Sequence, residues 1–197
     1  MLTSTLHTQA IMVVGQAGSG KSWWCGRYGR IWKEQHPEGT VYVFSAKDED
    51  RELDNVGVKR IMIDDELVNT PLDMEDFANS LVIFDDIDNI VDKKQRKAVM
   101  GLCDQMLGIG RAKRIWVIKT SHFFFNWQAT RGALMEANKV VYFPGHGSGR
   151  QGEDWLKKNA KLDKKQIATI NKLKSRWIVY DMTVPHYVLS EFDLIII

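Results

Sequence analysis

Between residues 15 and 22 the sequence reads Gly15-Gln16-Ala17-Gly18-Ser19-Gly20-Lys21-Ser22, which fits the pattern G-x-x-x-x-G-K-[ST] at every fixed position. The apolar residues 10–14 come directly before it, so a strand leads into this loop. The glycines let successive backbone N–H groups curl around phosphate oxygens, and the helix that begins here points its positive end at the same anion. We therefore predict that the whole segment binds nucleotide phosphates, with Lys21 on the β- and γ-phosphates and the Ser22 hydroxyl on Mg²⁺.

The composition is that of a globular protein. The chain has 197 residues, 44% of them hydrophobic and 26% charged, which suits one domain with a substantial core over residues 1–197. The net charge of +2 does not by itself indicate a nucleic-acid partner. Cys25 and Cys103 fall in apolar helical patterns without metal-ligand spacing, so we expect buried free thiols and a reducing compartment.

Targeting signals are absent from the sequence pattern. No apolar stretch approaches the ~20 residues that a membrane span needs. The first residues lack the basic-then-apolar order of a secretory signal. We expect a soluble protein that acts inside a cell or within a larger particle and is not secreted.

Strand-like and helical patterns alternate along the chain, which predicts an α/β fold with a mostly parallel central sheet flanked by helices. The main strands are expected at residues 9–14, 40–45, 81–84, 115–118 and 140–143, with a short extra strand at 60–63 and closing strands at 177–180 and in the last dozen residues. The expected helices cover residues 20–35, 93–107 and 163–173. Residues 47–54 are expected to form a charged surface loop, and residues 145–149 a glycine-rich one.

A second motif lies at residues 81–86, which read Leu-Val-Ile-Phe-Asp-Asp. Four apolar residues followed by two acids describe a buried strand with carboxylates at its carboxyl end, where ligands bind in open α/β sheets. With a phosphate loop in the same chain, Asp85 is the expected Mg²⁺ partner and Asp86 the group that orients or deprotonates an attacking water. Asp88 and Asp92 are expected to be surface or capping residues.

A third signal is the polar end of the strand at residues 115–118, where Thr120, Ser121 and His122 follow. In phosphate-loop ATPases with an additional strand between the two motif strands, a polar residue at this place senses the γ-phosphate. Ser121 or His122 would bond the phosphate or the attacking water. The alternative is a strand that simply meets a polar turn.

Arg111 lies just before this strand, and Arg131 lies in the helix after it. An arginine inserted from a neighbouring subunit can stabilise the charge that develops on a transferring phosphoryl group, and each of these two could do so. Each could equally be a surface or structural charge.

Basic residues gather in three clusters. The first cluster consists of Lys93, Lys94, Arg96 and Lys97, and the other two cover residues 111–114 and 157–165. Such clusters attract DNA phosphates without reading sequence, but they also occur on solvated helix faces.

Taken in order, these motifs resemble those of the FtsK–HerA superfamily. The similarity is greatest to the compact genome-packaging ATPases of double-stranded DNA viruses with double jelly-roll capsids, including the poxvirus and giant-virus type. It rests on residues 15–22, the Asp85-Asp86 pair, the step Gly110-Arg111, the polar end at residues 120–122, Arg131, and the capped helix and strands that close the chain. Two positions depart from the pattern, because His122 stands where a glutamine is common and Asp86 where cellular relatives often have glutamate.

The resemblance implies a RecA-like ATPase domain of the additional-strand type that uses ATP and Mg²⁺. It implies a ring of five or six subunits with ATP sites at the interfaces and double-stranded DNA in the channel. Arg111 or Arg131 would reach the adjacent subunit's γ-phosphate. Hydrolysis would move DNA into a preformed capsid, with capsid or vertex proteins as partners, in the virion or the host-cell interior.

Two other functions fit a phosphate loop in a chain of this size. A small nucleotide or metabolite kinase usually has an arginine-rich lid, whereas the region after the fourth strand offers Arg131 and Arg150 but no dense arginine cluster. A nucleotide-dependent assembly or switch protein would form oligomers with negligible hydrolysis.

Overall fold

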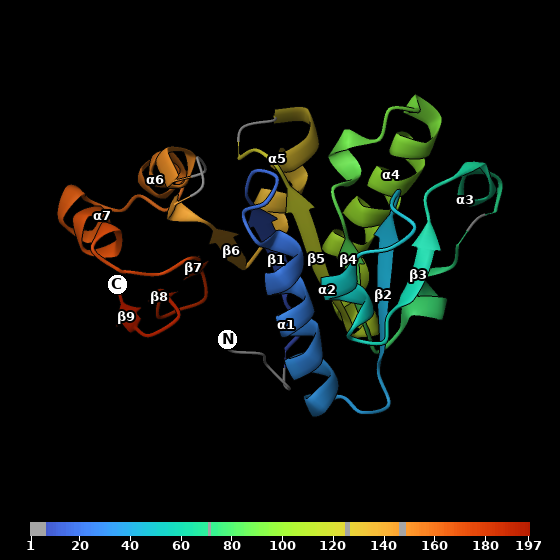
Figure 1. The fold of residues 1–197 in the computed structure, drawn as a ribbon, viewed down its shortest axis with the longest axis horizontal. Coiled ribbons are helices and arrows are strands. Elements are labelled where there is room, and N and C mark those ends of the chain that lie inside the picture. The colour runs from blue at the N-terminus through green and yellow to red at the C-terminus, as the bar shows by residue number, and fades with distance from the viewer. Residues whose placement is uncertain (1–6, 71, 125–126, 146–148) are drawn as a thin grey trace.

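The computed structural model describes residues 7–70, 72–124, 127–145 and 149–197, without the side chains of 127–131. In this part of the chain one sheet of nine strands runs in the order β3-β2-β4-β5-β1-β6-β7-β8-β9 (Figure 1). The strands are β1 Ala10–Val14, β2 Thr40–Ser45, β3 Lys59–Met62, β4 Ser80–Phe84, β5 Ile115–Ser121, β6 Lys139–Tyr142, β7 Ile178–Asp181, β8 Tyr187–Leu189 and β9 Leu194–Ile196. The helices are α1 Lys21–Gln35, α2 Arg51–Asp54, α3 Asp65–Asn69, α4 Lys93–Ile109, α5 Trp127–Glu136, α6 Gly149–Lys158 and α7 Lys164–Asn171, with the 3₁₀ turns η1 Met74–Phe77, η2 Ile87–Asn89 and η3 Gly110–Lys113.

The strands from β3 to β6 are parallel, and β7, β8 and β9 continue the sheet in antiparallel fashion. Strand β5 lies between β1, which leads into the phosphate loop, and β4, which leads into the acidic pair. The prediction of a mostly parallel sheet with an additional strand between the two motif strands is confirmed. All of these parallel strands end at one edge, the upper one in Figure 1.

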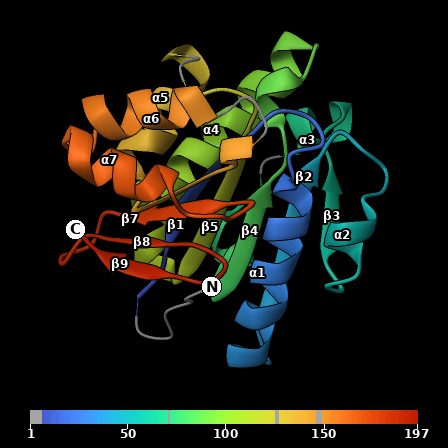
Figure 2. The same ribbon diagram turned by 60° about the vertical axis from the view of Figure 1, so that its left-hand side comes forward.

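Helices cover both faces of the sheet because successive strand residues point to opposite sides. In β1, Ile11 and Val13 pack with Trp24, Tyr28 and the rest of the buried face of α1, together with α2. The alternate residues of the same strand pack under α4, α5, α6 and α7 (Figure 2). Trp24, Tyr28 and Trp32 on one face of α1 are therefore core, and the two cysteines are buried and free as predicted.

Several local predictions were wrong in ways that have a physical reason. The expected loop at residues 47–54 contains α2, because the Asp50 carboxylate caps it by accepting the N–H groups of Glu52 and Leu53. Helix α6 was missed, since Gly149 and Gly152 weaken its sequence pattern. Of the glycine-rich loop predicted at 145–149, residues 146–148 lie outside the described residues.

Within the described ranges, no helix combines the length and the apolar character that crossing a lipid bilayer requires.

Candidate functional site: a phosphate loop facing paired carboxylates

The loop between β1 and α1 has a backbone that requires glycine. Gly18 and Gly20 have φ of +75° and +106°, in the region that L side chains rarely adopt. A Cβ on Gly15 would lie 2.3 Å from Ser19 Oγ and 2.8 Å from the Phe143 ring, so a larger residue would have to displace these side chains. The buried Ser19 hydroxyl has no hydrogen-bond partner among the described residues. A tight backbone cradle with an unsatisfied polar atom is what a bound anion would complete.

Lys21 folds back over this cradle. Its Nζ donates to the Gly15 carbonyl oxygen at 2.9 Å, and only 6% of the residue is exposed. The same Nζ lies 3.5 Å from Asp86 Oδ1. The loop cation and the second acid, which stand far apart in the sequence, therefore face each other across the site.

Thr120 holds the two carboxylates, a role that the sequence did not reveal. Its Oγ1 accepts the backbone N–H of Asp86 at 2.7 Å. The same hydroxyl lies 3.1 Å from Asp85 Oδ1 and 3.1 Å from Asp86 Oδ1, so these two oxygens share its single proton. Asp86 has φ of +49°, so its backbone turns sharply where β4 ends, and the bond from Thr120 stabilises that turn.

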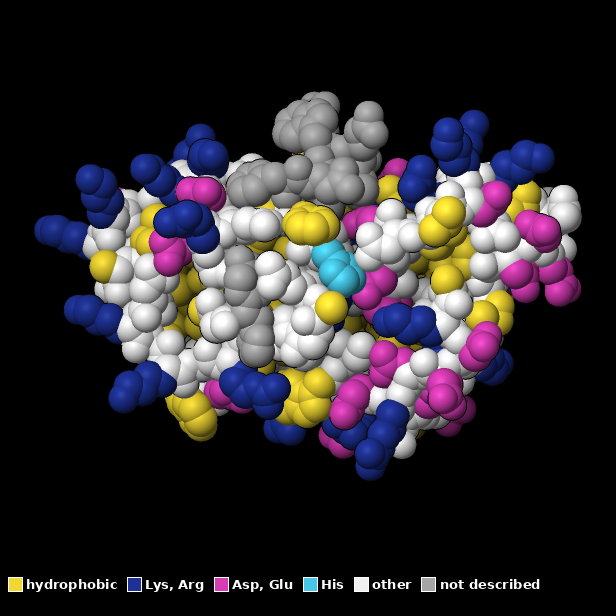
Figure 3. Space-filling model, turned by 45° about the horizontal axis from the view of Figure 1, so that its top comes forward, with side chains coloured by type: hydrophobic (Ala, Val, Ile, Leu, Met, Phe, Trp, Pro, Cys, Tyr) yellow, Lys and Arg dark blue, Asp and Glu magenta, His cyan; other side chains and the backbone are white. Residues whose placement is uncertain are grey.

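Two further groups, His122 and Lys47, approach Asp86 besides Thr120 and Lys21. His122 Nε2 lies 3.1 Å from Asp86 Oδ2, and Lys47 Nζ lies 3.8 Å from it and 3.3 Å from Asp85 Oδ2. Figure 3 looks toward this edge and shows a histidine side chain beside acidic side chains near the middle of the face. The contact with Asp86 supports the choice of His122 as a candidate at the end of β5.

The two acids differ electrostatically. Burial raises the pKa of Asp86, but Lys21, His122 and Lys47 outweigh it and hold this pKa below its usual value. Burial and the neighbouring Asp86 charge raise the pKa of Asp85 above its usual value, against Lys47 and Thr120. Asp86 is thus held as an anion. A positive charge near Asp85 in addition to Lys47 would favour the ionised form of Asp85.

Ser121, the other candidate for sensing the γ-phosphate, bonds Asp88 and not Asp85 or Asp86. Its hydroxyl donates to Asp88 Oδ2 at 2.6 Å, and the Nζ of the fully buried Lys119 lies 3.0 Å from Asp88 Oδ1. The expectation that Asp88 is a surface or capping residue was wrong, because its side chain is 5% exposed and partnered within this network. Asp92 does cap a helix, accepting the N–H groups of residues 94 and 95 at the start of α4.

Lys47 was missed as a site residue. It was assigned to a surface loop, and its side chain is indeed 52% exposed. The available signal was its position two residues beyond β2, whose carboxyl end meets the same edge as β1 and β4.

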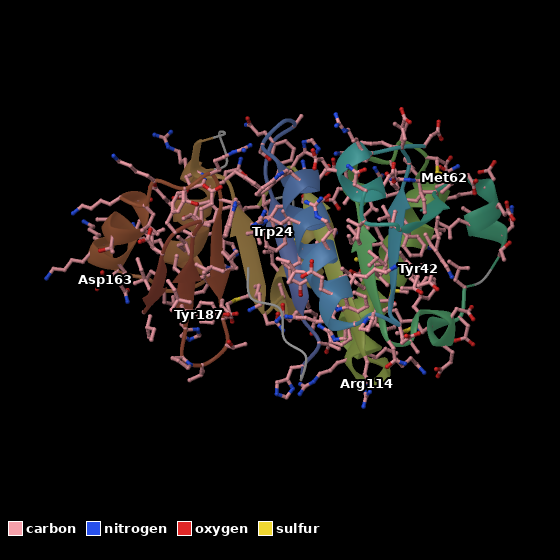
Figure 4. The ribbon with its side chains drawn as sticks, turned by 60° about the horizontal axis from the view of Figure 1, so that its bottom comes forward. Trp24, Tyr42, Met62, Arg114, Asp163 and Tyr187 are labelled. Carbon is pink, nitrogen blue, oxygen red and sulfur yellow. The ribbon has the colours of Figure 1, made fainter. Side chains whose placement is uncertain are left out.

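Arg111, one of the two predicted arginines, is not brought to the acids. Arg111 lies in η3 before β5 begins, so it stands at the opposite edge of the parallel sheet, where it lines a pocket with His36 and Trp116. Figure 4 labels Arg114, the next arginine in the chain, and Met62, the last residue of β3. The two residues lie at opposite ends of the sheet, which illustrates how far this segment is from the edge with the acids. Arg131 lies within α5, and its side chain is outside the described residues.

The basic clusters lie at different places around the sheet. Lys93, Lys94 and Lys97 are exposed at the start of α4, on the edge that carries the acids, whereas Arg96 is half-buried and donates to the Ile90 carbonyl oxygen at 3.2 Å. Residues 111–114 lie at the opposite edge. Lysine and arginine side chains also project over α6 and α7, on the left in Figure 3.

Comparisons with known proteins bear on the family and the fold of this chain. No protein-family model matches the sequence. The uncharacterized protein V3 of Sputnik virophage is 36% identical over 189 residues, which is 94% of this chain and 76% of V3. Both of the following structural similarities are to proteins of low identity and so concern the fold.

The genome packaging NTPase B204 of Sulfolobus turreted icosahedral virus 2, solved with AMPPCP, superposes with a TM-score of 0.56 at 14% identity, over 89% of this chain and 93% of B204. The pCW3 conjugation coupling protein TcpA, solved as a monomer with ATPγS, gives a TM-score of 0.61 at 11% identity, over 96% of this chain and 62% of TcpA.

Proposed function

This chain belongs to one family with the virophage protein V3, and we propose that it is a P-loop ATPase of the FtsK–HerA type, an ATP-hydrolysing motor that packages double-stranded viral DNA into a capsid. Its fold is that of nucleotide-hydrolysing P-loop proteins, which include a viral packaging NTPase. We treat residues 1–197 as one ATPase domain that works in the virion or the host-cell interior.

The observation that carries the proposal is the approach of Lys21 Nζ to Asp86 Oδ1, at 3.5 Å. It places the cation of the phosphate loop beside an ionised carboxylate at one edge of the sheet. A γ-phosphate on Lys21 would lie close to a water molecule on Asp86, which is the arrangement that hydrolysis needs. Asp86 then orients or deprotonates the water, and His122, in contact with Asp86, senses the phosphate. Ser121 supports the strand end through Asp88.

The residues also fit a magnesium ion bound with the nucleotide. Mg²⁺ in such sites usually takes one or two protein oxygens, while phosphate and water oxygens complete its shell. Ser22, in the first turn of α1, and the buried Asp85 are the oxygen donors that we assign to it. When bound, the ion neutralises charge on the β- and γ-phosphates. A nearby positive charge also offsets the burial that raises the pKa of Asp85.

DNA contact is the part of the proposal that rests on charge. The exposed Lys93, Lys94 and Lys97, with Arg96, begin α4 only a few residues after the acids, so DNA phosphates bound there would lie close to the ATP site. We propose a pentameric or hexameric ring around the DNA, docked on capsid or vertex proteins. In such a ring Arg111 or Arg131 serves the site of the adjacent subunit, since Arg111 lies far from the site of its own subunit.

The first test measures phosphate release from ATP, with and without double-stranded DNA. Lys21→Ala and Asp86→Asn should each abolish turnover, and DNA should stimulate the wild type. The control is Asp154→Asn, which removes an exposed acid on α6 and should leave the rate unchanged. Activity that survives Asp86→Asn would remove the assigned base. Release only in the presence of a phosphate acceptor would indicate a kinase, and oligomers without turnover would indicate a switch protein.

The second test concerns the subunit interface. Subunits carrying Arg111→Ala or Arg131→Ala are mixed with Lys21→Ala subunits, and one of the two mixtures should partly recover ATPase activity. The absence of recovery in both would exclude the inter-subunit arginine. DNA binding through the α4 cluster is checked by a salt series, where phosphate contacts weaken steeply.

A further inference from the structure

An aromatic side chain stands directly after the phosphate loop. Trp23 follows Ser22 in the first turn of α1, whereas Trp24 and Tyr28 of the same helix are buried in the core. The Trp23 side chain packs against the edge of that core and is only half-buried. Part of its ring is thus exposed beside the loop.

Two arginines flank this ring. The guanidinium carbon of Arg27 lies 5.8 Å from the ring centroid, and that of Arg176 lies 5.7 Å from it. Arg27 is one turn further along α1, but Arg176 comes from the distant segment between α7 and β7. A guanidinium nitrogen of Arg176 lies 3.8 Å from where a Cβ on Gly20 would stand. A cation from the C-terminal part of the chain therefore lies close to the phosphate loop.

The topology explains why this segment reaches the loop. Strand β7 is antiparallel to β6 and pairs Ile178, its first residue, with Tyr142, the last residue of β6. The start of β7 consequently lies at the edge where the parallel strands end. The segment is held there by Ser175, whose Oγ donates to the Trp177 carbonyl at 2.6 Å and accepts the Glu191 N–H at 3.1 Å.

The acids and Arg176 lie on opposite sides of the loop. In the order β4-β5-β1-β6-β7, the acids follow β4 and Arg176 precedes β7, with β1 and its loop between them. A nucleotide whose γ-phosphate faces Asp86 extends the rest of its length away from the acids. We propose that Trp23 stacks on the base of a bound purine nucleoside triphosphate and that Arg176 binds its α-phosphate end.

This assignment rests on the proposed nucleotide binding and adds how the base is held. Stacking on an indole and a guanidinium plane favours any flat base and does not read its edges, so ATP and GTP should bind with similar strength. The base should nevertheless add substantially to the affinity of the triphosphate alone.

The test compares two probes, Mg·ATP and Mg·tripolyphosphate, by isothermal titration calorimetry on the full chain. Trp23→Ala should raise the Kd for ATP by about 5- to 150-fold and leave the Kd for tripolyphosphate unchanged, whereas Trp23→Phe should keep most of the ATP affinity. Arg176→Ala should also weaken ATP. Lys174→Ala, an exposed neighbour in the same segment, is the matched control and should change neither value.

The outcomes separate this inference from the proposed function. Lys21→Ala should weaken both probes, and a wild type that binds neither would refute nucleotide binding itself. If ATP and tripolyphosphate bind the wild type, but Trp23→Ala weakens both equally or neither, the base site is refuted while nucleotide binding stands. A second readout is intrinsic fluorescence, since ATP should quench the wild type more than Trp23→Phe.

Discussion

Thr120→Val tests whether one hydroxyl sets the geometry of the acidic pair. Valine keeps the shape of the side chain and removes the oxygen that accepts the Asp86 N–H at 2.7 Å and donates to the two carboxylates. Thr120 is 1% exposed, so water cannot take over these bonds. The substitution therefore leaves a buried backbone donor without an acceptor.

The expected loss follows from that unpaired donor. An unsatisfied buried polar group costs about 1–3 kcal/mol, and in a chain of this length 1 kcal/mol corresponds to about 2–4 °C in Tm. We expect the free energy of unfolding to fall by about 2 kcal/mol and the Tm by about 4–8 °C. ATP hydrolysis should fall by about tenfold or more, because the turn at Asp86 loses the bond that positions it.

Calorimetry and steady-state phosphate release measure the two effects. Thr120→Ser keeps the hydroxyl and should retain most of the stability and the activity. Thr169→Val removes a comparable hydroxyl from an exposed bond on α7, to the Lys165 carbonyl, and should change little. Equal melting temperatures for Thr120→Val and Thr120→Ser would refute the reasoning.

Three further predictions concern stability. Gly26→Ala should lower the free energy of unfolding by about 1–3 kcal/mol, because its Cβ would lie 2.2 Å from a carbonyl oxygen of α2. Gly101→Ala in α4, where a Cβ would meet no atom of the described residues within 4 Å beyond the neighbouring backbone of its own helix, should raise it by about 0.5–1 kcal/mol; urea unfolding of the pair checks both signs. Lys139→Met should lower the free energy of unfolding by about 3–5 kcal/mol, since it leaves the buried Asp181 carboxylate without its cationic partner. A double variant that also carries Asp181→Leu should recover part of this loss in the same assay. Burial raises the pKa of both cysteine thiols, so above pH ~8.5 only the unfolded chain loses these protons. The free energy of unfolding should therefore fall by about 1.4 kcal/mol per pH unit for each thiol. Unfolding measured at pH 8 and 9.5 should show this slope in the wild type and a flatter one in a variant with both cysteines changed to alanine.

The sequence predicted the parts of the site that are local. Residues 15–22 and the Asp85-Asp86 pair each follow an apolar strand directly, so the pattern contains both the residue and its position at the sheet edge. His122 was found by the same logic at the end of β5. The fold class followed from the alternation of strand and helix patterns.

The parts of the site that depend on contacts between segments far apart in the sequence could not be predicted in this way. Lys47 and Asp88 join the site only because β2 and β5 flank β4, and charged residues after a strand are otherwise typical of solvent-exposed loops. Arg111 shows the converse, since it is close in sequence to the strand that ends at the site but stands before that strand begins. Arg176 lies close to the loop because β7 runs antiparallel to β6. A short apolar run in the sequence does not indicate whether the strand is parallel or antiparallel to its neighbour.

The end of β5 has a consequence for how the proposed ATPase activity can be changed by substitution. Its last two residues hold both halves of the site, because the Ser121 carbonyl accepts the Gly15 N–H at 3.0 Å and the Thr120 hydroxyl accepts the Asp86 N–H. A displacement of this strand end moves the phosphate loop and the Asp86 carboxylate together. Substitutions in β5 should therefore change KM and kcat jointly, and affinity and turnover can be varied independently only from outside this strand.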